Sequence, residues 1–394
     1  MDQPLKGIRV LDFTHLLPGE LLSALLSDLG AEIVRIEAPS RGLAHRLPPV
    51  VEGESLYYWA LNKRKKRLVI NLKDERGKEI ALRLAESFDL VIENFRPGVM
   101  ERLGLGYESL AALNPAIIYC SISGYGKNSK EALKPAHDLN LVAEAGVLDL
   151  NRRQGERPVI PAIPISDYMA GLLAALSVVS ALYKRKETGR GEHLDIGMLD
   201  SALSSLNILA SMAMYTGLEP DEGDFIYPRE MPDYNVYRTG DGRFLAVASL
   251  EDPFWKTFCE KIGRPDLLDA RKKDRDRELI EDIGSVIESK TLAEWEAIFE
   301  GADCCVSPVN TLAEALERFP LFERGMLDEI FHPTLGNIKQ VVFPVDRKLR
   351  NASKEPHIVN GYNDVQSLLE NAGYTRAEID TLVQGKVVSH QQCD

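Results

Sequence analysis

Short apolar runs alternate with amphipathic stretches through the first third of this chain. Residues 8–13 and 32–36 are typical of buried strands, and residues 21–29 between them have a helical pattern that ends at Gly30. A strand, a helix and a second strand in this order form a βαβ unit. The alternation continues with strands expected at residues 67–71, 90–92 and 117–123 and helices expected at residues 76–87, 107–112 and, later, 198–213. The sequence therefore predicts an α/β domain with a parallel sheet covered by helices.

The turn after the first predicted strand argues against dinucleotide binding, which is a common function of such a sheet. Residues 14–22 read THLLPGELL, without the G-x-G-x-x-G pattern that binds a dinucleotide, and no P-loop occurs elsewhere. An enzyme with the usual nicotinamide or flavin site is therefore not expected. Ligands of open α/β sheets bind beyond the carboxyl ends of the strands. Arg96 and Arg102 follow the strand expected at residues 90–92, so they are candidate ligand contacts.

The charge distribution narrows the possible ligands. The 394 residues carry a net charge of −13, which argues against general binding to nucleic acid or to a membrane surface. Five consecutive cations at residues 63–67 stand out against this background. They form either a solvated loop or a local patch for the phosphate groups of a small anionic ligand. The sequence alone leaves both interpretations open.

One carboxylate precedes the longest apolar run. Asp167 is followed by residues 168–183, which contain no charge. The run is short for a membrane span and contains Gly171, so a buried core helix is predicted. Asp167 is then either the cap of this helix or a catalytic group. His137, after the strand expected at residues 117–123, presents the same choice between structure and function.

The length of the chain and its local composition predict two domains. Residues 1–215 form the large α/β domain, and residues 216–233, rich in proline, glycine and acidic residues, form a linker. Residues 234–330 contain a hairpin signal followed by helical patterns, typical of a small α+β domain. Residues 331–394 are expected to return and pack on the large domain.

The cysteines and the N-terminal residues indicate a cytoplasmic protein. The five cysteines form no C-x-x-C pair, which predicts reduced thiols and no metal site. The first residues, MDQPLKGIRVLDF, lack the apolar core of a signal peptide.

Several segments resemble, in correct order and spacing, the class III CoA-transferase family (CaiB/BaiF type), which includes the α-methylacyl-CoA racemases. They read GIRVLDFT, LLSDLGAEIVRIE, VIENFRPGVMERLGLGYESL, NPAIIYCSISGYG and KRKETGRGEHLDIGMLDSAL. The resemblance implies a large Rossmann-like domain with a small α+β domain, and an interlocked, ring-like homodimer. It also implies an acyl-CoA substrate, with no cofactor beyond the CoA of that substrate.

The resemblance also implies the residues of the site. Asp167 matches the catalytic aspartate of the family within IPISDYMAG, and His137 matches the catalytic histidine of the racemases within HDLN. Glu251 resembles a glutamate of the racemases, with proline one place later. In the family, CoA is held around segments that match Ile70, Asn71, Leu72, Lys73, Asn94, Phe95, Arg96, Arg102, Ala136 and Asp138.

Two reactions are compatible with these residues. In the racemases, Asp167 and His137 would exchange the α-proton of a 2-methylacyl-CoA from opposite faces, which needs two bases with a pKa near neutral. Burial at the mouth of an apolar helix would raise the pKa of Asp167 toward that range, and free helix amides could stabilise an oxyanion. In the transferases, the aspartate attacks acyl-CoA and forms a mixed anhydride. The tyrosine that formyl-CoA-type transferases carry at the position of His137 is absent, which favours racemase chemistry.

Overall fold

The computed structural model describes residues 3–40, 42–152, 156–218, 231–270, 276–350 and 362–389. Two compact units divide the chain: Met1–Ala210 with Phe322–Asp394, and Ser211–Leu321. The first unit is therefore discontinuous in sequence. Residues 322–330, assigned from the sequence to the small domain, belong to this first unit. Most of the predicted linker, residues 216–233, lies outside the described residues.

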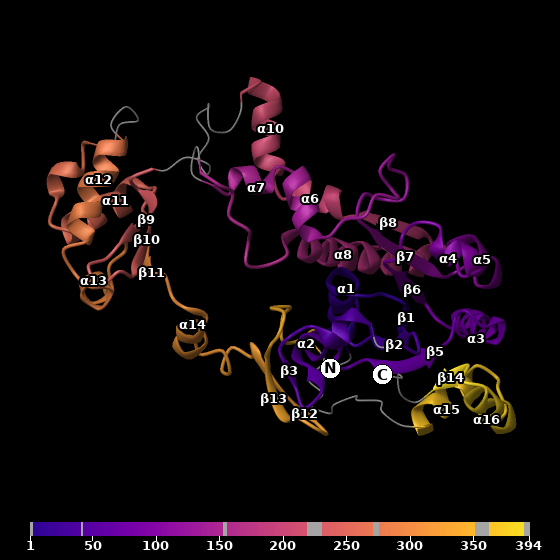
Figure 1. Ribbon diagram of the computed structural model, residues 1–394. Coiled ribbons are helices and arrows are strands. Elements are labelled where there is room, and N and C mark those ends of the chain that lie inside the picture. The colour runs from indigo at the N-terminus through magenta and orange to yellow at the C-terminus, as the bar shows by residue number, and fades with distance from the viewer. Residues whose placement is uncertain are drawn as a thin grey trace. The chain divides into compact units, whose positions relative to one another are not determined.

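A seven-stranded sheet forms the centre of the first unit (Figure 1). Six strands run parallel, as the sequence predicts, and the last is antiparallel at one edge. Across the sheet the order is β14-β5-β2-β1-β6-β7-β8. The strands are β1 (Arg9–Asp12), β2 (Glu32–Glu37), β5 (Lys66–Ile70), β6 (Leu90–Glu93), β7 (Ile118–Ser123), β8 (His193–Gly197) and β14 (Val388–Ser389).

The order of the strands reverses beside β1. The chain moves outward from β1 through β2 to β5, and then returns to add β6, β7 and β8 on the other side. Val10 is in register with both Ile33 of β2 and Leu90 of β6, so β1 holds the two halves together. The loops after β1 and β6 leave the same edge in opposite directions. Open α/β sheets bind their ligands in the crevice that such a reversal creates.

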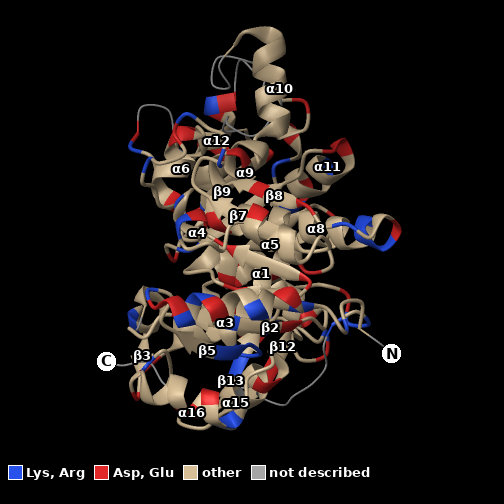
Figure 2. Cartoon of the chain, turned by 90° about the vertical axis from the view of Figure 1, so that its right-hand side faces the viewer, with Lys and Arg blue, Asp and Glu red and all other residues tan. Residues whose placement is uncertain are grey.

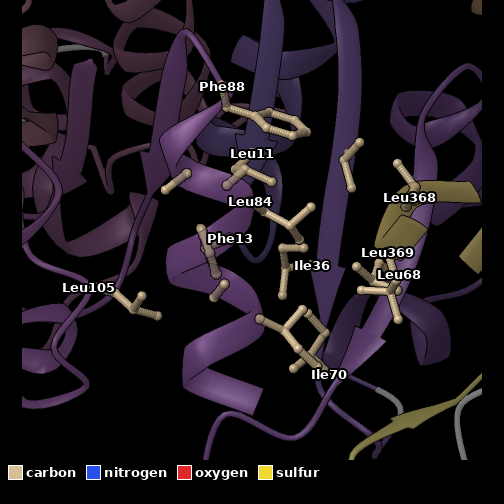
Figure 3. Close-up of a cluster of buried hydrophobic side chains, with 14 of the residues drawn as sticks. Leu11, Phe13, Ile36, Leu68, Ile70, Leu84, Phe88, Leu105, Leu368 and Leu369 are labelled. Carbon is tan, nitrogen blue, oxygen red and sulfur yellow. The ribbon is translucent and has the colours of Figure 1, made fainter. Parts of the chain in front are cut away.

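Helices cover both faces of this sheet. On one face, α1 (Leu17–Asp28) and α8 (Ile165–Thr188) pack over Val10 and Ile118. The other face is covered by α3 (Glu75–Glu86), α5 (Tyr107–Leu113), α15 (Tyr362–Asn371) and α16 (Arg376–Gln384). Figure 3 shows the apolar cluster on this second face, where Leu368 and Leu369 of α15 lie close to Leu68 of β5. The C-terminal residues thus complete a core that the N-terminal strands begin.

The apolar helix α8 is buried along one side only. Ala174 and Val178 are fully buried against the sheet, whereas Leu172 and Leu176 are 45% and 64% exposed. The helix has 24 residues, more than the predicted apolar run. By length and composition alone it could cross a membrane, although 44% of its most apolar window is buried within the protein. A core helix of a soluble protein has the same properties, so this finding is weak evidence for a membrane span.

The run of five cations does not form an open phosphate patch. Each member is paired with a carboxylate: Lys63 and Arg64 with Asp328, Lys65 with Asp12, Lys66 with Glu32, and Arg67 with Glu37. Lys63, Arg64 and Lys65 are also buried. In Figure 2, basic and acidic residues are likewise interspersed along α3. Neither interpretation of residues 63–67 is correct: internal ion pairs neutralise the run, so it is not an open phosphate patch, and its first three members are buried, so it is not a solvated loop.

Two hairpins and a short helix pack at the β5 side of the unit. The chain after β2 forms η1 (Leu43–Arg46), β3 (Val50–Val51), β4 (Glu54–Ser55) and α2 (Leu56–Asn62). The returning segment adds β12 (Leu327–His332) and β13 (Gly336–Val341). The Gln340 side chain donates to the Trp59 carbonyl at 3.1 Å, and the His332 ring meets the Trp59 ring edge-on at 4.4 Å. These contacts anchor the returning hairpin to α2.

The single helix expected over residues 198–213 is in fact two helices, α9 (Met198–Ser204) and α10 (Asn207–Thr216). The hydroxyl groups of Ser204 and Ser205 donate to the Ser201 and Ala202 carbonyls. Such bonds compete with the hydrogen bonds of the helical backbone, and the helix ends at this pair of serines. The remaining helices of the unit are α4 (Val99–Arg102), α6 (Asp138–Glu144) and α7 (Val147–Leu150).

The second unit is a small α+β structure with its own core. An antiparallel sheet orders β11-β10-β9, and β9 and β10 form the hairpin that the sequence predicts. Trp255, Phe258, Ile283 and Trp295 fill the core. The elements are β9 (Tyr234–Arg238), β10 (Phe244–Ala248), α11 (Asp252–Lys261), η2 (Pro265–Leu267), α12 (Asp276–Ile287), α13 (Leu292–Phe299), β11 (Val306–Pro308) and α14 (Leu312–Arg318).

Candidate active site

A cavity of about 430 Å³ lies at the carboxyl edge of the large sheet, within the first unit. Its walls come from the loops after β1, β6 and β7, from the first turn of α8 and from the start of α9. The cavity therefore occupies the crevice at the reversal of strand order. Its polar lining residues are His15, Asn94, Arg96, Ser123, Lys134, His137, Asn140 and Asp167.

Asp138 holds the start of α8, from which Asp167 reaches the cavity. Its Oδ1 accepts hydrogen bonds from the Ser166 amide at 2.6 Å, the Ser166 hydroxyl at 2.8 Å and the Asp167 amide at 3.3 Å. These are orphan donors of a helix terminus, so Asp138 supplies the cap. Among the described residues, none is recorded as a hydrogen-bond partner of the Asp167 carboxyl group. Asp167 is therefore not the cap, and the Ser166 and Asp167 amides are not free for an oxyanion.

The surroundings of Asp167 hold its carboxyl group near the midpoint of its titration at neutral pH. Burial raises the pKa of Asp167 to about 7, and the negative charge of Asp138 acts in the same direction. Both effects disfavour the ionised form. A carboxyl group with this pKa can take a proton and give it back at neutral pH, which general acid–base catalysis requires.

Gly171 sets the depth at which α8 packs on α1. A Cβ at this position would lie 2.8 Å from Cδ2 of Leu21 and 2.9 Å from the carbonyl oxygen of Pro18, closer than packed atoms allow. Gly171 follows Asp167 by four residues, so the two lie on one face of the helix. Pro18 also lines the cavity. The glycine thus permits the close approach that brings Asp167 to the cavity wall.

His137 lines the same cavity from the segment that begins α6. Its backbone amide donates to Oδ1 of Asn140 at 3.1 Å, which fixes the first turn of that helix. The His137 side chain is exposed to solvent. Because the next residue, Asp138, caps α8, one short segment determines the positions of both His137 and Asp167.

The loops after β1 and β6 are tied together on the opposite wall. Asn94 Oδ1 accepts from the His15 amide at 2.7 Å, and the Asn94 side-chain amide donates to the His15 carbonyl. The rings of His15 and Phe95 meet edge-on, 5.0 Å between centroids. Leu16 has a φ of 65°, a conformation that is uncommon for a residue other than glycine. Backbone strain of this kind clusters at functional sites, where surrounding contacts hold it.

Three of the cations expected to bind CoA are available to an anionic ligand. Among the described residues, no ion pair is recorded for Lys73, Arg96 or Arg102, and all three side chains are exposed. Arg96 lines the cavity, Lys73 follows β5, and Arg102 ends α4. Cationic groups without an internal partner suit phosphate oxygens, in contrast to the paired run at residues 63–67.

The cavity brings together some of the predicted site residues and not others. Ile70 is buried in β5, in register with Val388, so the structure does not expose it to a ligand. Glu251 lies in the second unit, as the residue before α11, and its action beside His137 stays a prediction. The predicted residues that line the cavity are Asp167, His137, Asn94, Phe95, Arg96 and Ala136; Asn71, Leu72, Lys73, Arg102 and Asp138 do not line it.

The sequence interpretation did not single out His15 or Lys134, which line this cavity. It also missed a second cavity of about 350 Å³ that shares His15 and Leu16 with the first and is lined by Arg35 and His45. His15 comes three residues after β1 ends, and this place beyond a strand end was a usable signal. No comparable signal marks Lys134, which lies in a loop.

The cavity offers a carboxyl group, an imidazole and cationic side chains within one mostly apolar recess. Within the described ranges, no group of three or more His, Cys, Asp or Glu side chains is placed to hold a metal ion. The side chains present are suited to proton transfer at a carbon beside a carbonyl, or to nucleophilic attack by a carboxylate on a thioester.

A family model described as CoA-transferase family III matches residues 5–357, which include the cavity and most of the sheet. The chain belongs to CoA-transferase family III. Family members with CoA-transferase activity and with racemase activity are both similar to nearly the whole chain, so the protein is an enzyme of CoA-transferase or racemase type. Family membership also agrees with an acyl-CoA substrate.

Individual relatives of this family III protein divide between the two activities. The alpha-methylacyl-CoA racemase of Mus musculus is 34% identical over 98% of this chain and 97% of that protein. The succinyl-CoA:glutarate CoA-transferase of Homo sapiens is 29% identical over 99% of this chain and 91% of that protein. A crystal structure of a CaiB/BaiF family protein from Brucella suis has a TM-score of 0.81 at 24% identity, covering 94% of this chain and all of that chain, which supports the fold.

Proposed function

We propose that this family III enzyme racemises a 2-methylacyl-CoA by exchanging its α-proton through Asp167 and His137. One observation carries the proposal: the two side chains line one cavity from different segments, and burial raises the pKa of Asp167 to about 7. Racemisation needs a base on each side of the α-carbon, and each must be able to return the proton. The similarity to the mouse racemase supports the same reaction.

In this mechanism the acyl group enters the cavity with its α-carbon between the two bases. One base removes the α-proton and leaves an enolate, and the other base delivers a proton to the opposite face. Which base acts first depends on the configuration of the substrate. We place the CoA phosphates near Arg96, Lys73 and Arg102, because these cations are exposed and the structure records no ion pair for them among the described residues. No cofactor beyond the CoA of the substrate enters the proposal.

A CoA transferase is the second candidate, and a different observation favours it. Arg96 lines the cavity, and no ion pair is recorded for it among the described residues, so it could hold a free carboxylic acid beside Asp167. Lys134 also lines the cavity, but its ammonium group is already paired with Glu144 at 2.7 Å. Among the described residues, no hydrogen bond engages the Asp167 carboxyl group, which leaves its oxygens free to attack a thioester. The attack would expel CoA thiolate and form a mixed anhydride on Asp167. The thiolate would then attack the aspartyl carbonyl and release the donor acid, the acceptor carboxylate would displace the thiolate to form a second anhydride, and the thiolate would take the acceptor acyl group and free Asp167.

An isotope experiment tests the first candidate against the second. The purified protein is incubated in heavy water with a saturating 2-methylacyl-CoA of one configuration and no carboxylic acid. Racemase chemistry predicts deuterium at the α-carbon and the appearance of the second epimer. Absence of both, together with CoA transfer when a carboxylic acid is added, would overturn the racemase proposal.

Two variants sharpen this comparison. Asp167→Ala is expected to abolish either reaction, so it serves as the inactive reference. His137→Ala should stop formation of the second epimer, because inversion needs a proton donor on each face; Asp167 can still exchange the α-proton of the epimer that it faces. If the His137→Ala protein still transfers CoA and hydroxylamine traps an acyl group on Asp167, the chain is a transferase.

We also propose that the chain forms an interlocked homodimer in the cytoplasm. Leu172, Leu176 and Tyr183 on the outer side of α8 are 45%, 64% and 69% exposed, and a contiguous apolar stripe of this kind is typical of an interface. The described cysteines are free thiols, which a reducing compartment maintains. Sedimentation of the wild-type protein and of Leu176→Glu tests the dimer: a wild-type monomer, or an unchanged dimer in the variant, contradicts this interface.

A further inference from the structure

Glu93 is a buried carboxyl group that the proposed mechanism does not use. It is the last residue of β6, only 7% exposed, and it does not line either cavity. Its Oε2 accepts a hydrogen bond from the Phe95 amide at 2.8 Å. Ser121 lies opposite Glu93 on the neighbouring strand β7. The Ser121 hydroxyl in turn lies 2.9 Å from Nε2 of His193.

The segment that Glu93 holds is the wall of the cavity. The turn at residues 94–96 leaves β6 at the reversal of strand order, and all three of its side chains line the cavity. Asn94 ties one end of the turn to the His15 backbone. The Glu93–Phe95 hydrogen bond ties the other end back to the sheet. Arg96 comes directly after Phe95, so its position depends on this second attachment.

Burying the Glu93 carboxyl group costs free energy, which indicates that its hydrogen bond with the Phe95 amide is important. Burial raises the pKa of Glu93 to about 7, with Glu101 adding to the effect and Lys127 opposing it. A buried acid of this kind lowers the stability of the protein at higher pH. An apolar residue would fill the same place without that cost, but it could not accept the hydrogen bond from Phe95.

We propose that Glu93 is a positioning residue that sets the affinity for CoA by fixing the Phe95–Arg96 wall through the Phe95 amide. It acts through these two residues and does not touch the ligand. The inference rests on the proposed binding of CoA along this wall. This role assigns two functions to different parts of the cavity. Asp167 and His137 catalyse the reaction, and the turn after β6 determines the affinity for CoA.

Direct binding of CoA to the full-length protein tests this role without relying on turnover. Calorimetry gives the Kd of wild-type protein and of Glu93→Ala, Glu93→Gln and the exposed control Glu108→Gln. Loss of the hydrogen bond and of the order it imposes predicts a Kd about tenfold weaker in Glu93→Ala. Glu93→Gln keeps an acceptor oxygen, so its Kd should stay within about threefold of wild type. With saturating acyl-CoA, kcat should change far less than Kd.

The outcomes distinguish failure of the proposed function from failure of the role of Glu93. If wild-type protein does not bind CoA, the proposed function fails and this inference fails with it. If wild type binds CoA and Glu93→Ala binds equally well, or loses kcat at unchanged Kd, only the role of Glu93 is wrong.

Two further variants keep the inference testable should Glu93→Ala not fold. Glu93→Asp withdraws the carboxyl group by one methylene and should weaken CoA binding, whereas unchanged binding would contradict the proposal. Adding Arg96→Met to Glu93→Asp should weaken binding by less than Arg96→Met does in the wild-type protein, because Glu93 acts through that wall. Full additivity would overturn the route through Arg96.

Discussion

Replacing Asp167 with asparagine is expected to stabilise the folded protein at pH 8 while it abolishes activity. The carboxyl group has a pKa of about 7 in the folded protein, raised by burial and by Asp138, against 3.8 for an ordinary aspartate. Between these two values the folded state binds more protons than the unfolded state. The free energy of unfolding therefore falls as pH rises from about 4 to 7, and the full penalty applies above that range.

The size of the effect follows from the displacement of the pKa of Asp167 from 3.8 to about 7. At 1.36 kcal/mol for each pH unit, the ionised carboxylate costs about 4 kcal/mol at pH 8. This is an upper limit, because the side chain is only partly buried. Asparagine has nearly the same shape and carries no charge. We therefore expect Asp167→Asn to gain between about 1 and 4 kcal/mol at pH 8.

Urea denaturation at pH 4.5 and pH 8, followed by far-UV circular dichroism and fluorescence, measures this difference. Asp167→Asn should gain stability at pH 8 and little at pH 4.5, where the wild-type carboxyl group is already protonated. Glu86→Gln, an exposed acid on α3, is the control and should change stability by less than about 0.5 kcal/mol at either pH. An Asp167→Asn protein that gains nothing at pH 8, or gains equally at both values, would refute the reasoning.

A substitution at Asp138, which lies beside Asp167, changes the pKa of Asp167. Asp138→Asn removes the like charge but keeps a side-chain oxygen for the Ser166 and Asp167 amides. The pKa of Asp167 should fall, although not to 3.8, because burial is its larger cause. The acid limb of the pH dependence of kcat/KM should therefore move to lower pH. An unchanged acid limb would show that Asp138 acts only as a cap.

Two contrasts test the packing and the cations. A Cβ at Gly171 would lie 2.8 Å from Leu21, so Gly171→Ala should lower Tm and kcat; the free energy of unfolding should fall, and the activation free energy rise, by about 1 kcal/mol or more each. The Cβ of Gly284→Ala has space, so this variant should have a higher Tm. Equal effects of the two variants on Tm would contradict this explanation. Arg64 is buried and pairs with the carboxylates of Asp28 and Asp328, so Arg64→Met should cost about 3 kcal/mol of stability, measured by urea denaturation. Arg96→Met should leave stability within about 0.5 kcal/mol and weaken CoA binding; the reverse pattern would contradict the distinction between paired and available cations.

The strands and the position of the site were predictable because the signals for them are local. Short apolar runs between helical patterns revealed β1, β2, β5, β6 and β7 of the large sheet, and the end of β6 located Arg96. The pairing of Arg64 was not predictable, since its partner Asp328 is supplied by a hairpin that returns from the far end of the chain. The cap of α8 was missed for the same reason, because Asp138 reaches it from another element. The motif HDLN marked Asp138 as a residue near the site, but the sequence could not show which groups its side chain contacts.

The pairing of β14 with β5 has a consequence for the turn that follows β5. Val388 is in register with Ile70, and the Asn71 amide donates to the Val387 carbonyl at 2.8 Å. The turn after β5, which is expected to hold the CoA phosphates, is thus attached to a strand that lies far along the sequence, beyond the second unit. A chain that contains Asp167 and His137 but lacks β14 would lose this attachment. We therefore expect the order of the turn after β5 to depend on the docking of β14 against β5.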